Sequence, residues 1–486
     1  MSTGILAFGA YVPRKRLQRS AVHAANAWFA PGLKGLAKGE RAIGDWDEDS
    51  LTMAVEAARD TLAAFDRGQI DTVLLASTTF PFADRQNCGV IKEALNLPDR
   101  VATLDLGGSL RAATGALIQA LRVTAGTNAA PQLCLASDLR KARPASEPEL
   151  IYGDAAAGLL VGAGATIANY LGSYSVSADF VDHYRAAGSD FEYAWEARWV
   201  RDEGYNKLLV GALKDALQAL GVAADAVNHL IIPINVRGIA TSVARQAGFN
   251  PAVVVDTLAD RLGDSGAAHP FVLLVSALEK AKPGEKIILV GFGQGVDVIL
   301  FEATESLGQL APRKGVTGSL ALGKKDDNYM RWLFHRGVID LEKGMRAEAD
   351  YKQLAAPLWR QHKAVFGLVG GRCTRTGTVQ FPKSDISVDS NDPARSTQED
   401  YPLADRRARI VSYTADVLTY SPSPPFYYGL IDFHGGGRLK VEFADVEPGD
   451  LRVGREIEMV FRIKAVDERR GFKKYFWKAK PVAEES

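Results

Sequence analysis

Short apolar runs alternate with amphipathic segments through the part of the chain before Gly308. Val, Ile and Leu run together in the apolar segments, as in strands buried inside a sheet. In the amphipathic segments apolar residues recur with the period of a helix. The predicted strands are 70–77, 101–106 and 131–137, and the predicted helices are 49–65 and 109–126. Asp49 or Ser50 is placed to cap the first helix. Strands that alternate with helices predict a layered α/β domain.

The same order of elements returns in the second part of the chain. The matching segments are 227–234 for the first strand, 252–258 for the second, 266–281 for the following helix and 285–301 for a closing pair of strands. We infer an internal duplication, with halves at 1–168 and 169–304. Such a duplication places the two strand-to-helix turns, one at Ser109 and one at Asp264, face to face.

A different pattern begins after the duplicated part. Residues 305–328 are charged and without period, which indicates a linker, and an aromatic-rich helical stretch follows from Tyr329 to His362. After Arg407, strands alternate with glycine-rich turns over about 80 residues, which is typical of a small closed barrel such as an OB fold. We therefore predict a linker and helical segment at 305–366 and an all-β OB-fold domain at 401–486.

Composition and charge narrow the classes of function. The chain has 486 residues, with 58 basic and 58 acidic side chains and a formal net charge of zero. This balance argues against a nucleic-acid partner and against a membrane surface, since both usually require a basic excess. No apolar run is long enough to span a bilayer, and the first residues lack the order of a signal peptide. The three cysteines have no paired spacing, so a cytoplasmic protein is expected.

Motifs from both halves together resemble one known group of enzymes. They are the turn after "TLDL" (103–106), "YGDAAAGLLVG" (152–162), "GDSGAAHP" (263–270) and "GFGQGVDV" (291–298). Over about residues 2–302 the chain resembles the thiolase superfamily, in particular 3-hydroxy-3-methylglutaryl-CoA synthases and the chain-initiating 3-oxoacyl-ACP synthases. The resemblance implies a duplicated, layered αβαβα thiolase-like fold and a coenzyme A thioester as substrate. It also implies a homodimer formed through the thiolase-like part.

The chain departs from this family at each position that carries the family's chemistry. The nucleophilic cysteine at the tip of the first turn is replaced by Leu110, which cannot be acylated. The family's acid falls near Thr78, and its histidine falls at Ile234 and Asn235. The asparagine or histidine of the second turn is replaced by Asp264.

Residues 367–400 resemble a degenerate zinc ribbon. The resemblance is to the rubredoxin-like segment that accompanies an OB fold beside thiolase-like enzymes acting on acyl-CoA. Where that segment usually carries four cysteines, this chain keeps only Cys373, and Thr376 stands at its CxxC partner position. One thiolate cannot form a tetrahedral zinc site, so no metal is expected.

The second turn holds two candidate catalytic residues, Asp264 and His269. A carboxylate that faces the cavity could act as a base, and a histidine near it could shuttle a proton. Alternatively, Asp264 caps the helix and His269 is a satisfied polar group of the core. At the first turn, Ser109 could be a weak nucleophile or a donor, or simply a helix cap. Cys88, at the start of a helix, could be a displaced nucleophile or a small core residue.

His183 belongs to a segment, 177–209, that is dense in aromatic and charged residues. By the resemblance, this insertion lines the acyl pocket, which makes His183 a candidate together with Asp182, Tyr184 and Arg185. A solvated surface at a dimer contact is the alternative.

The remaining candidates would bind rather than react. By the resemblance, Gly293 and Gly295 form the glycine loop beside the reacting carbonyl, where a backbone amide can supply an oxyanion donor. Arg14 and Arg16 could meet the phosphates of coenzyme A as point charges, or be solvated surface groups.

Three functions remain open. The first is an acyl-CoA-acting transferase or synthase of the Claisen or retro-Claisen type, which normally needs a covalent acyl-enzyme. The second is a cysteine-independent aldolase, a retro-aldol lyase on a 3-hydroxyacyl-CoA, which needs a base and an oxyanion hole but no thiolate. The third is a non-catalytic subunit that binds acyl-CoA or acts as a scaffold. The retained glycines and the polar second turn favour an enzyme.

Overall fold

The computed structural model describes residues 2–125, 129–349 and 355–483. The chain divides into two compact units. The first consists of Met1–Asp45, Asp49–Gly89 and Pro98–Trp332, and the second of Trp46–Glu48, Val90–Leu97 and Leu333–Ser486. The second unit thus includes two short segments from early in the chain. Within the described residues, no helix has both the length and the apolar character needed to cross a membrane.

A single nine-stranded mixed sheet forms the frame of the first unit. In order across the sheet, its strands are β11 (His229–Ile231), β12 (Lys286–Phe292), β13 (Gly295–Ala303), β8 (Ala168–Ser177), β1 (Thr3–Tyr11), β7 (Ala155–Ala163), β6 (Gln132–Asp138), β4 (Thr72–Ala76) and β5 (Ala102–Leu106). The two halves meet where β1 pairs with β8.

The two halves of this sheet repeat each other. From β1 outward the order is β7, β6, β4 and β5, and from β8 outward it is β13, β12 and β11. In both halves the first pairs are antiparallel and the outer pairs parallel. A parallel bridge between Leu230 and Val254 stands in the second half where β5 stands in the first. The strand order therefore agrees with the duplication inferred from the sequence.

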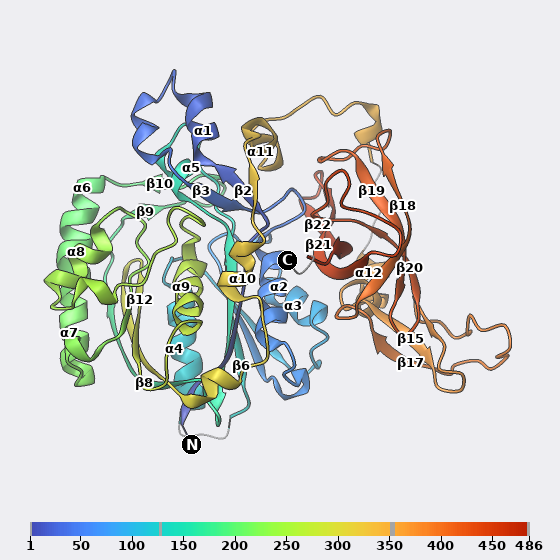
Figure 1. The fold of residues 1–486 in the computed structure, drawn as a ribbon, viewed down its shortest axis with the longest axis horizontal. Helices are drawn as coiled ribbons and strands as arrows, with labels where there is room; N and C mark the ends of the chain where they lie inside the picture. The colour runs from blue at the N-terminus through green and yellow to red at the C-terminus, as the bar shows by residue number, and fades with distance from the viewer. Residues whose placement is uncertain (1, 126–128, 350–354, 484–486) are drawn as a thin grey trace. The chain divides into compact units, whose positions relative to one another are not determined.

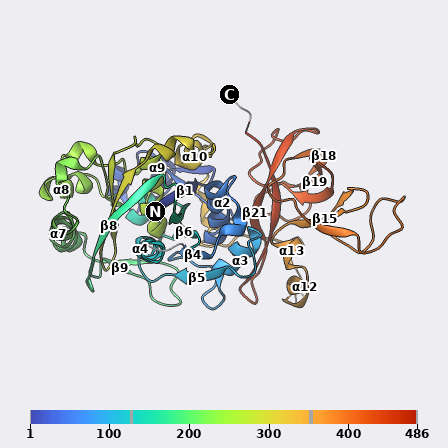
Figure 2. The same cartoon turned by 90° about the horizontal axis from the view of Figure 1, so that it is seen from below.

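Helices complete five layers in the first unit. Figures 1 and 2 show α4 (Ala112–Thr124) and α9 (His269–Leu278) in the middle, between the strands of the two halves. The outer faces are covered by α2 (Ser50–Leu62) on one side, and by α7 (Val210–Leu220) and α8 (Ile239–Gln246) on the other. The central helices are buried because their apolar residues pack against both halves of the sheet.

The capping prediction for the helix at 49–65 is confirmed at Asp49. Its side chain accepts hydrogen bonds from the amides of Leu51 and Thr52, and its own amide donates to Thr52 Oγ1, which completes a capping box. Of the predicted helix at 109–126, α4 accounts for the central part, and residue 126 lies outside the described residues.

The segment predicted as a linker, 305–328, contains packed structure of the first unit. It forms α10 (Gly315–Ala321) and β14 (Lys324–Asp326), and β14 pairs in parallel with β2 (Lys15–Gln18), which in turn pairs with β3 (Glu40–Ile43). The Glu279 carboxylate accepts the amides at the start of α10. The smaller helical elements of this unit are α1 (Arg19–Asn26), η1 (Pro31–Leu36), α5 (Glu147–Ile151), α6 (Ala197–Trp199) and the π-helix η3 (Val200–Leu209).

The second unit ends in a five-stranded antiparallel sheet. Its order is β20 (Arg438–Glu442), β19 (Phe426–Phe433), β18 (Ala408–Asp416), β21 (Glu456–Asp467) and β22 (Phe472–Pro481). A bridge between Phe443 and Ala479 links the two outer ends, as expected for a barrel. Before it lie the short helices α12 (Ala355–Arg360) and α13 (His362–Val365) and a small sheet of β16 (Val379–Gln380), β15 (Val369–Cys373) and β17 (Gln398–Pro402).

Buried charges hold an early segment of the chain in this second unit. The Arg462 guanidinium is fully buried and lies 3.1 Å from Glu48 Oε1 and 3.2 Å from Asp445 Oδ2. The Lys478 ammonium, also buried, lies 2.9 Å from Asp47 Oδ2. Each buried cation thus has a carboxylate from Trp46–Glu48 as a partner.

Candidate active site

The first strand-to-helix turn connects β5 to α4 and carries Ser109, Leu110 and Arg111 at its tip. Gly108 has φ +82°, a conformation that side chains other than glycine rarely adopt, and it turns the chain sharply. Ser109 Oγ accepts the Arg111 amide at 3.1 Å. The serine therefore makes a local side-chain-to-amide bond within the turn, but it is not the cap of α4, because the N-cap position is held by Arg111.

The glycine loop between β12 and β13 lies directly against this turn. Gly293 has φ +154°, and a Cβ added to it would stand 2.9 Å from Ser109 Oγ and 3.3 Å from the Leu110 amide nitrogen. Ser109 Oγ donates to the Gly293 carbonyl at 2.9 Å. The Gly293 amide donates to the Gly295 carbonyl at 3.1 Å. The hydroxyl of Ser109 and the amide of Gly293 are therefore both engaged within the protein.

A buried ion pair joins the two halves beside this contact. Arg111 Nη1 lies 2.9 Å from Asp297 Oδ1 on β13, and the Asp297 side chain is 2% exposed. Asp297 also accepts from Thr114 Oγ1 at 2.8 Å and from Ser175 Oγ at 2.7 Å. These partners satisfy a carboxylate that would otherwise be costly to bury.

The second turn places Asp264 at its tip, as predicted. Asp264 Oδ1 accepts the Gly266 amide at 2.9 Å, and Oδ2 lies 3.4 Å from Arg140 Nη1. Its side chain is 22% exposed. Asp264 thus makes a local turn bond one residue before the N-cap position, which Ser265 holds, and it also presents one oxygen to its surroundings.

His269 begins α9 and is buried. Its Nδ1 lies 3.2 Å from Ser265 Oγ, so the ring contacts the serine next to Asp264. Burial lowers the pKa of His269, although the negative charge of Asp264 opposes this shift. The lowered pKa keeps the imidazole neutral. A neutral, buried ring fits the alternative interpretation of a core polar group better than that of an exposed proton shuttle.

Asp138, at the end of β6, connects the loop after β4 to the second turn. It is buried and accepts five hydrogen bonds: from Ser77 Oγ, from the Thr78 amide and hydroxyl, from Thr79 Oγ1 and from the Ala267 amide. Burial raises the pKa of Asp138, although the hydrogen bonds oppose the shift. The loop at Thr78, where the resemblance places the family's acid, therefore binds a carboxylate instead of supplying one.

Arg140 is the charged centre of the site. Its side chain is only 3% exposed, and its Nε and Nη2 lie 3.0 and 2.6 Å from the two carboxylate oxygens of Glu192. The guanidinium stacks over the Tyr152 ring at 3.6 Å, and the Tyr152 hydroxyl donates to Glu192 Oε2 at 2.6 Å. Burial disfavours the Glu192 carboxylate, but Arg140 outweighs it and lowers the pKa of Glu192 to about 2.

The insertion at 177–209 supplies more polar groups to the same place. His183 Nδ1 lies 3.1 Å from Asp182 Oδ1. Burial works against the charged ring, but the hydrogen bond and charge of Asp182 raise the pKa of His183. Tyr205, on the π-helix η3, is held protonated because burial and the nearby Asp182 and Asp264 all raise its pKa. Irregular π-turns often occur at functional sites.

Comparisons with known proteins agree with this architecture. Residues 217–299 match the family model described as 3-oxoacyl-[acyl-carrier-protein (ACP)] synthase III C terminal. Residues 401–462 match the model described as ChsH2, C-terminal OB-fold domain. The hydroxymethylglutaryl-CoA synthase of Caldivirga maquilingensis is 26% identical over 356 residues, covering 71% of this chain and 100% of the relative. That of Methanocella arvoryzae is 26% identical over 352 residues, covering 70% and 100%.

Solved structures show the same fold. An HMG-CoA synthase from Bacillus subtilis superposes with a TM-score of 0.61 at 16% identity, over 72% of this chain and 95% of that chain. The 3-oxoacyl-(acyl carrier protein) synthase III of Pseudomonas aeruginosa superposes with a TM-score of 0.56 at 20% identity, over 63% and 99%. The resemblance to the thiolase superfamily is confirmed. The first unit has the thiolase-like fold of this synthase branch, and an OB fold follows it.

Two residues predicted as candidates, Arg16 and Cys88, are buried and bonded to backbone carbonyls, so neither takes part in the candidate site. Arg16 is buried, and its guanidinium donates to the carbonyls of Pro13 and Ser319, the latter at 3.1 Å. Arg16 is therefore not available to a phosphate in solution, and that assignment is corrected. Arg14 is partly exposed and stays a prediction. Cys88 is a buried core residue whose Sγ donates to the Val73 carbonyl at 3.3 Å, and burial raises its pKa.

The structure brings together most of the predicted residues of the thiolase-like site. Asp264, His269 and His183 share one electrostatic neighbourhood with Arg140, and Ser109 contacts the Gly293 loop. Sequence reasoning missed several charged residues, which lie at the first turn, at or just beyond the end of a buried strand, within an apolar strand, or in the insertion. They are Arg111, Asp138, Arg140, Glu192 and Asp297. Asp297, the single acid in "GVDVILF", could have been predicted to bind a buried partner, because a lone charge in a buried strand needs one.

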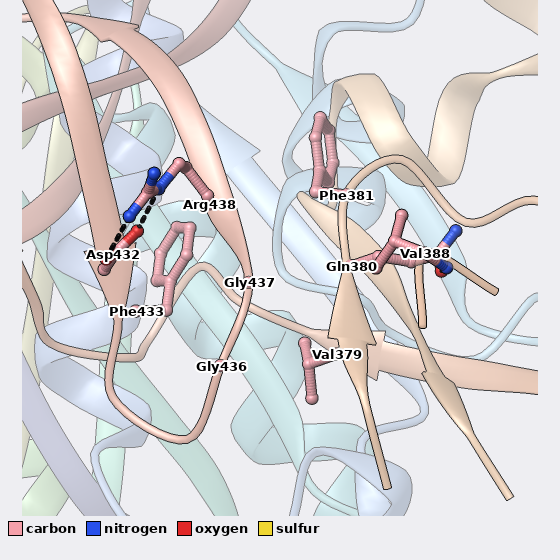
Figure 3. A pocket seen from close by; sticks show the side chains of 9 residues that line it. All are labelled: Val379, Gln380, Phe381, Val388, Asp432, Phe433, Gly436, Gly437 and Arg438. Carbon is pink, nitrogen blue, oxygen red and sulfur yellow. Dashed lines mark hydrogen bonds and ion pairs between the residues drawn. The ribbon is translucent and has the colours of Figure 1, made fainter. Parts of the chain in front are cut away.

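A separate pocket of about 540 Å³ lies in the second unit (Figure 3). Phe381 and Phe433 stand on opposite sides of it, and Arg438 is paired with Asp432 by two hydrogen bonds of 2.7 and 2.8 Å. In the segment at 367–400, Cys373 Sγ donates to Asp392 Oδ2 at 3.0 Å. Within the described ranges no three His, Cys, Asp or Glu side chains gather as metal ligands do.

Proposed function

We propose that this protein makes or breaks a C–C bond next to the thioester of an acyl-CoA without a cysteine nucleophile. The observation that carries the proposal is the position of Leu110 at the tip of the first turn, against the glycine loop. The two thiols of the thiolase-like part, Cys88 and Cys134, are buried, and burial raises the pKa of Cys134 to about 12. A buried, protonated thiol is a poor nucleophile.

The substrate class rests on the similarity to hydroxymethylglutaryl-CoA synthases. The name hydroxymethylglutaryl-CoA synthase implies, for these relatives, a CoA thioester and a condensation beside its carbonyl. Both relatives are covered along their full length, so the similarity extends over the whole of each synthase.

The aldol type of reaction fits the residues better than a covalent acyl transfer. In the cleavage direction, Asp264 Oδ2 takes the proton of the substrate 3-hydroxyl and the C2–C3 bond breaks. C3 becomes a carbonyl, and the electron pair moves into the thioester as an enolate. The enolate then takes a proton at C2, for which protonated His183 is the donor. In the opposite direction the same groups exchange roles.

The covalent Claisen or retro-Claisen alternative requires a nucleophile at the first turn. Ser109 is the nearest hydroxyl, but its proton is donated to the Gly293 carbonyl and no base is bonded to it. A third alternative, a non-catalytic acyl-CoA-binding or scaffolding subunit, draws support from the loss of the family's reactive residues. The ionised cluster around Arg140 at the second turn favours catalysis, because charged groups with shifted pKa values are frequent at active sites.

The experiment is to incubate the pure protein with a panel of 3-hydroxyacyl- and 3-oxoacyl-CoAs, following free CoA and acetyl-CoA by chromatography and the protein by mass spectrometry. The proposal expects a shortened acyl-CoA and a carbonyl product with the protein mass unchanged. An acyl adduct on Ser109 or Cys88 that turns over would overturn it in favour of covalent transfer. Binding of the thioesters without any turnover would establish the non-catalytic alternative.

We also propose a cytoplasmic homodimer formed through the thiolase-like part. The support is β5, which is the edge strand of the nine-stranded sheet and leaves Leu104 54% exposed. An exposed edge strand offers unpaired backbone groups to a second copy. Light scattering at micromolar concentration should give twice the chain mass, and a monomer there would count against the proposal.

A further inference from the structure

Two carboxylates compete for one buried guanidinium at the second turn. Glu192 holds the Nε and Nη2 side of Arg140 in a two-point pair, at 3.0 and 2.6 Å. Asp264 has only Nη1, at 3.4 Å. Paired two-point contacts between arginine and a carboxylate are the strong ones. Arg140 is therefore paired mainly with Glu192, and Asp264 has one longer contact with it.

Tyr152 biases this competition toward Glu192. Its ring lies under the guanidinium, 3.6 Å away, and its hydroxyl donates to Glu192 Oε2 at 2.6 Å. Tyr152 therefore fixes both members of the pair. Asp264 is held from the other side, because its Oδ1 accepts the Gly266 amide. Its Oδ2 is the oxygen left to face the site.

We propose that Glu192 is a positioning residue, which occupies the two-point side of Arg140 and so limits Asp264 Oδ2 to the single 3.4 Å contact with Nη1, in which it can still take a proton from the substrate. This inference rests on the proposed role of Asp264 as the base. Glu192 lies in the insertion at 177–209, so this one residue of the insertion acts on the base through Arg140, whereas the exposed Asp190 nearby does not contact Arg140. Without Glu192, the guanidinium would turn its two-point side to Asp264 and sequester it.

The groups that face this pair come from many segments. Around Arg140 and Asp264 the titratable or charged side chains are Asp138, Tyr152, Asp182, His183, Glu192, Tyr205 and His269. Of these, Glu192 is the only one that contacts the Nε and Nη2 side of Arg140 in the described part of the chain. The test therefore changes the charge of Glu192 and leaves the others in place.

The test compares Glu192→Gln with a matched variant of the same insertion. Gln keeps the size and one acceptor oxygen but removes the charge that holds Arg140. Asp190→Asn removes a carboxylate that is 66% exposed and paired with Lys141 at 3.3 Å, and it serves as the control. Tyr152→Phe removes only the hydroxyl that ties Glu192, so it should act in the same direction more weakly.

Kinetics give the first readout. Glu192→Gln should lower kcat at least about tenfold, with KM within about threefold, because the base and not the binding is impaired. Losing a neighbouring negative charge favours the ionised base, so the acid limb of the pH–rate profile should move about one unit to lower pH. Asp190→Asn should leave both unchanged. A fall in kcat with an unmoved acid limb would reduce Glu192 to a structural residue and overturn the inference.

A crystal structure of Glu192→Gln gives a readout that does not depend on turnover. The inference expects Arg140 to turn toward Asp264, with two nitrogen–oxygen distances of hydrogen-bond length in place of the single 3.4 Å contact. An unmoved Arg140 overturns the inference even if the protein is an active enzyme. A turned Arg140 in a protein that cleaves none of the acyl-CoAs upholds the competition for the guanidinium and overturns the proposed function instead.

Discussion

Arg111 and Asp297 form an ion pair of 2.9 Å that joins the tip of the first turn to β13 in the opposite half of the sheet. The same arginine donates from Nε to the Gly293 carbonyl at 3.3 Å. One side chain thus fixes both the strand and the glycine loop next to Leu110. At the turn where the resembling family has a reactive thiolate, this chain has an arginine, Arg111, that holds the turn against the opposite half.

Arg111→Gln should destabilise the first unit because it leaves Asp297 buried without a cation. Removing one partner of a fully buried pair costs about 3 to 5 kcal/mol, and the partial exposure of Arg111 reduces the expected loss to about 2 kcal/mol. Urea unfolding measures it. Arg122→Gln, on the exposed face of the same helix, should change stability little. If both variants lose equally little, the pair contributes nothing to the free energy of unfolding.

Asp264→Asn tests whether Asp264 acts as a base or only holds the second turn through its bond to the Gly266 amide. Asn keeps the oxygen that accepts the Gly266 amide, so folding should be almost unchanged. If Asp264 is the base, turnover should fall at least about a hundredfold. Steady-state kinetics on a substrate found by the acyl-CoA panel measure it. Turnover within about threefold of the natural protein would mean that Asp264 only holds the second turn.

Stability toward acid should depend on Glu192. Its pKa in the folded protein, about 2, lies below the usual 4.5, so its contribution is fully present above pH 4.5. It is lost as the pH falls through about 2. The shift corresponds to at most about 3 kcal/mol. In urea titrations at several pH values, the natural protein should lose its advantage over Glu192→Gln between pH 4.5 and 2. A difference that stays constant over that range contradicts the assignment.

In the second unit, Asp47→Asn should destabilise by about 3 kcal/mol or more, because it leaves Lys478 buried with a weaker set of partners. The double variant Asp47→Asn with Lys478→Met should recover part of this loss, since it removes the unpaired charge as well. Denaturant unfolding followed by tryptophan fluorescence can detect both effects, because Trp477 is buried in this unit. A double variant less stable than the sum of the two single changes would contradict the pairing.

The repeating architecture could be predicted from the sequence because it depends on the apolar pattern alone. The strand around Leu74 and the helix capped by Asp49 carried local signals of burial and capping, and both are buried. The apolar run around Leu104 predicted a strand correctly, but this strand lies at the sheet edge and is partly exposed. The position of Asp264 at the second turn followed from the duplication. The candidate site was predicted only where a motif marked it.

The rest of the site depends on contacts that local pattern does not encode. Glu192 lies 52 residues from Arg140 in sequence, and Arg111 lies 186 residues from Asp297. Each of these pairs is held by the way the two halves pack, so neither partner predicts the other. The error at Arg16 has the same origin, since the carbonyl of Ser319 reaches it from a segment that had no periodic signal.

The pairing of β14 with β2 has a consequence for how the chain is made. During synthesis, β2 is made long before its partner strand β14, because the paired residues Lys15 and Lys324 are more than three hundred residues apart. Until then one edge of β2 has no neighbour, and an open edge can pair with other nascent chains. The three-stranded sheet is therefore completed late in synthesis, and a ribosome-bound chain that ends before Lys324 leaves that edge of β2 open.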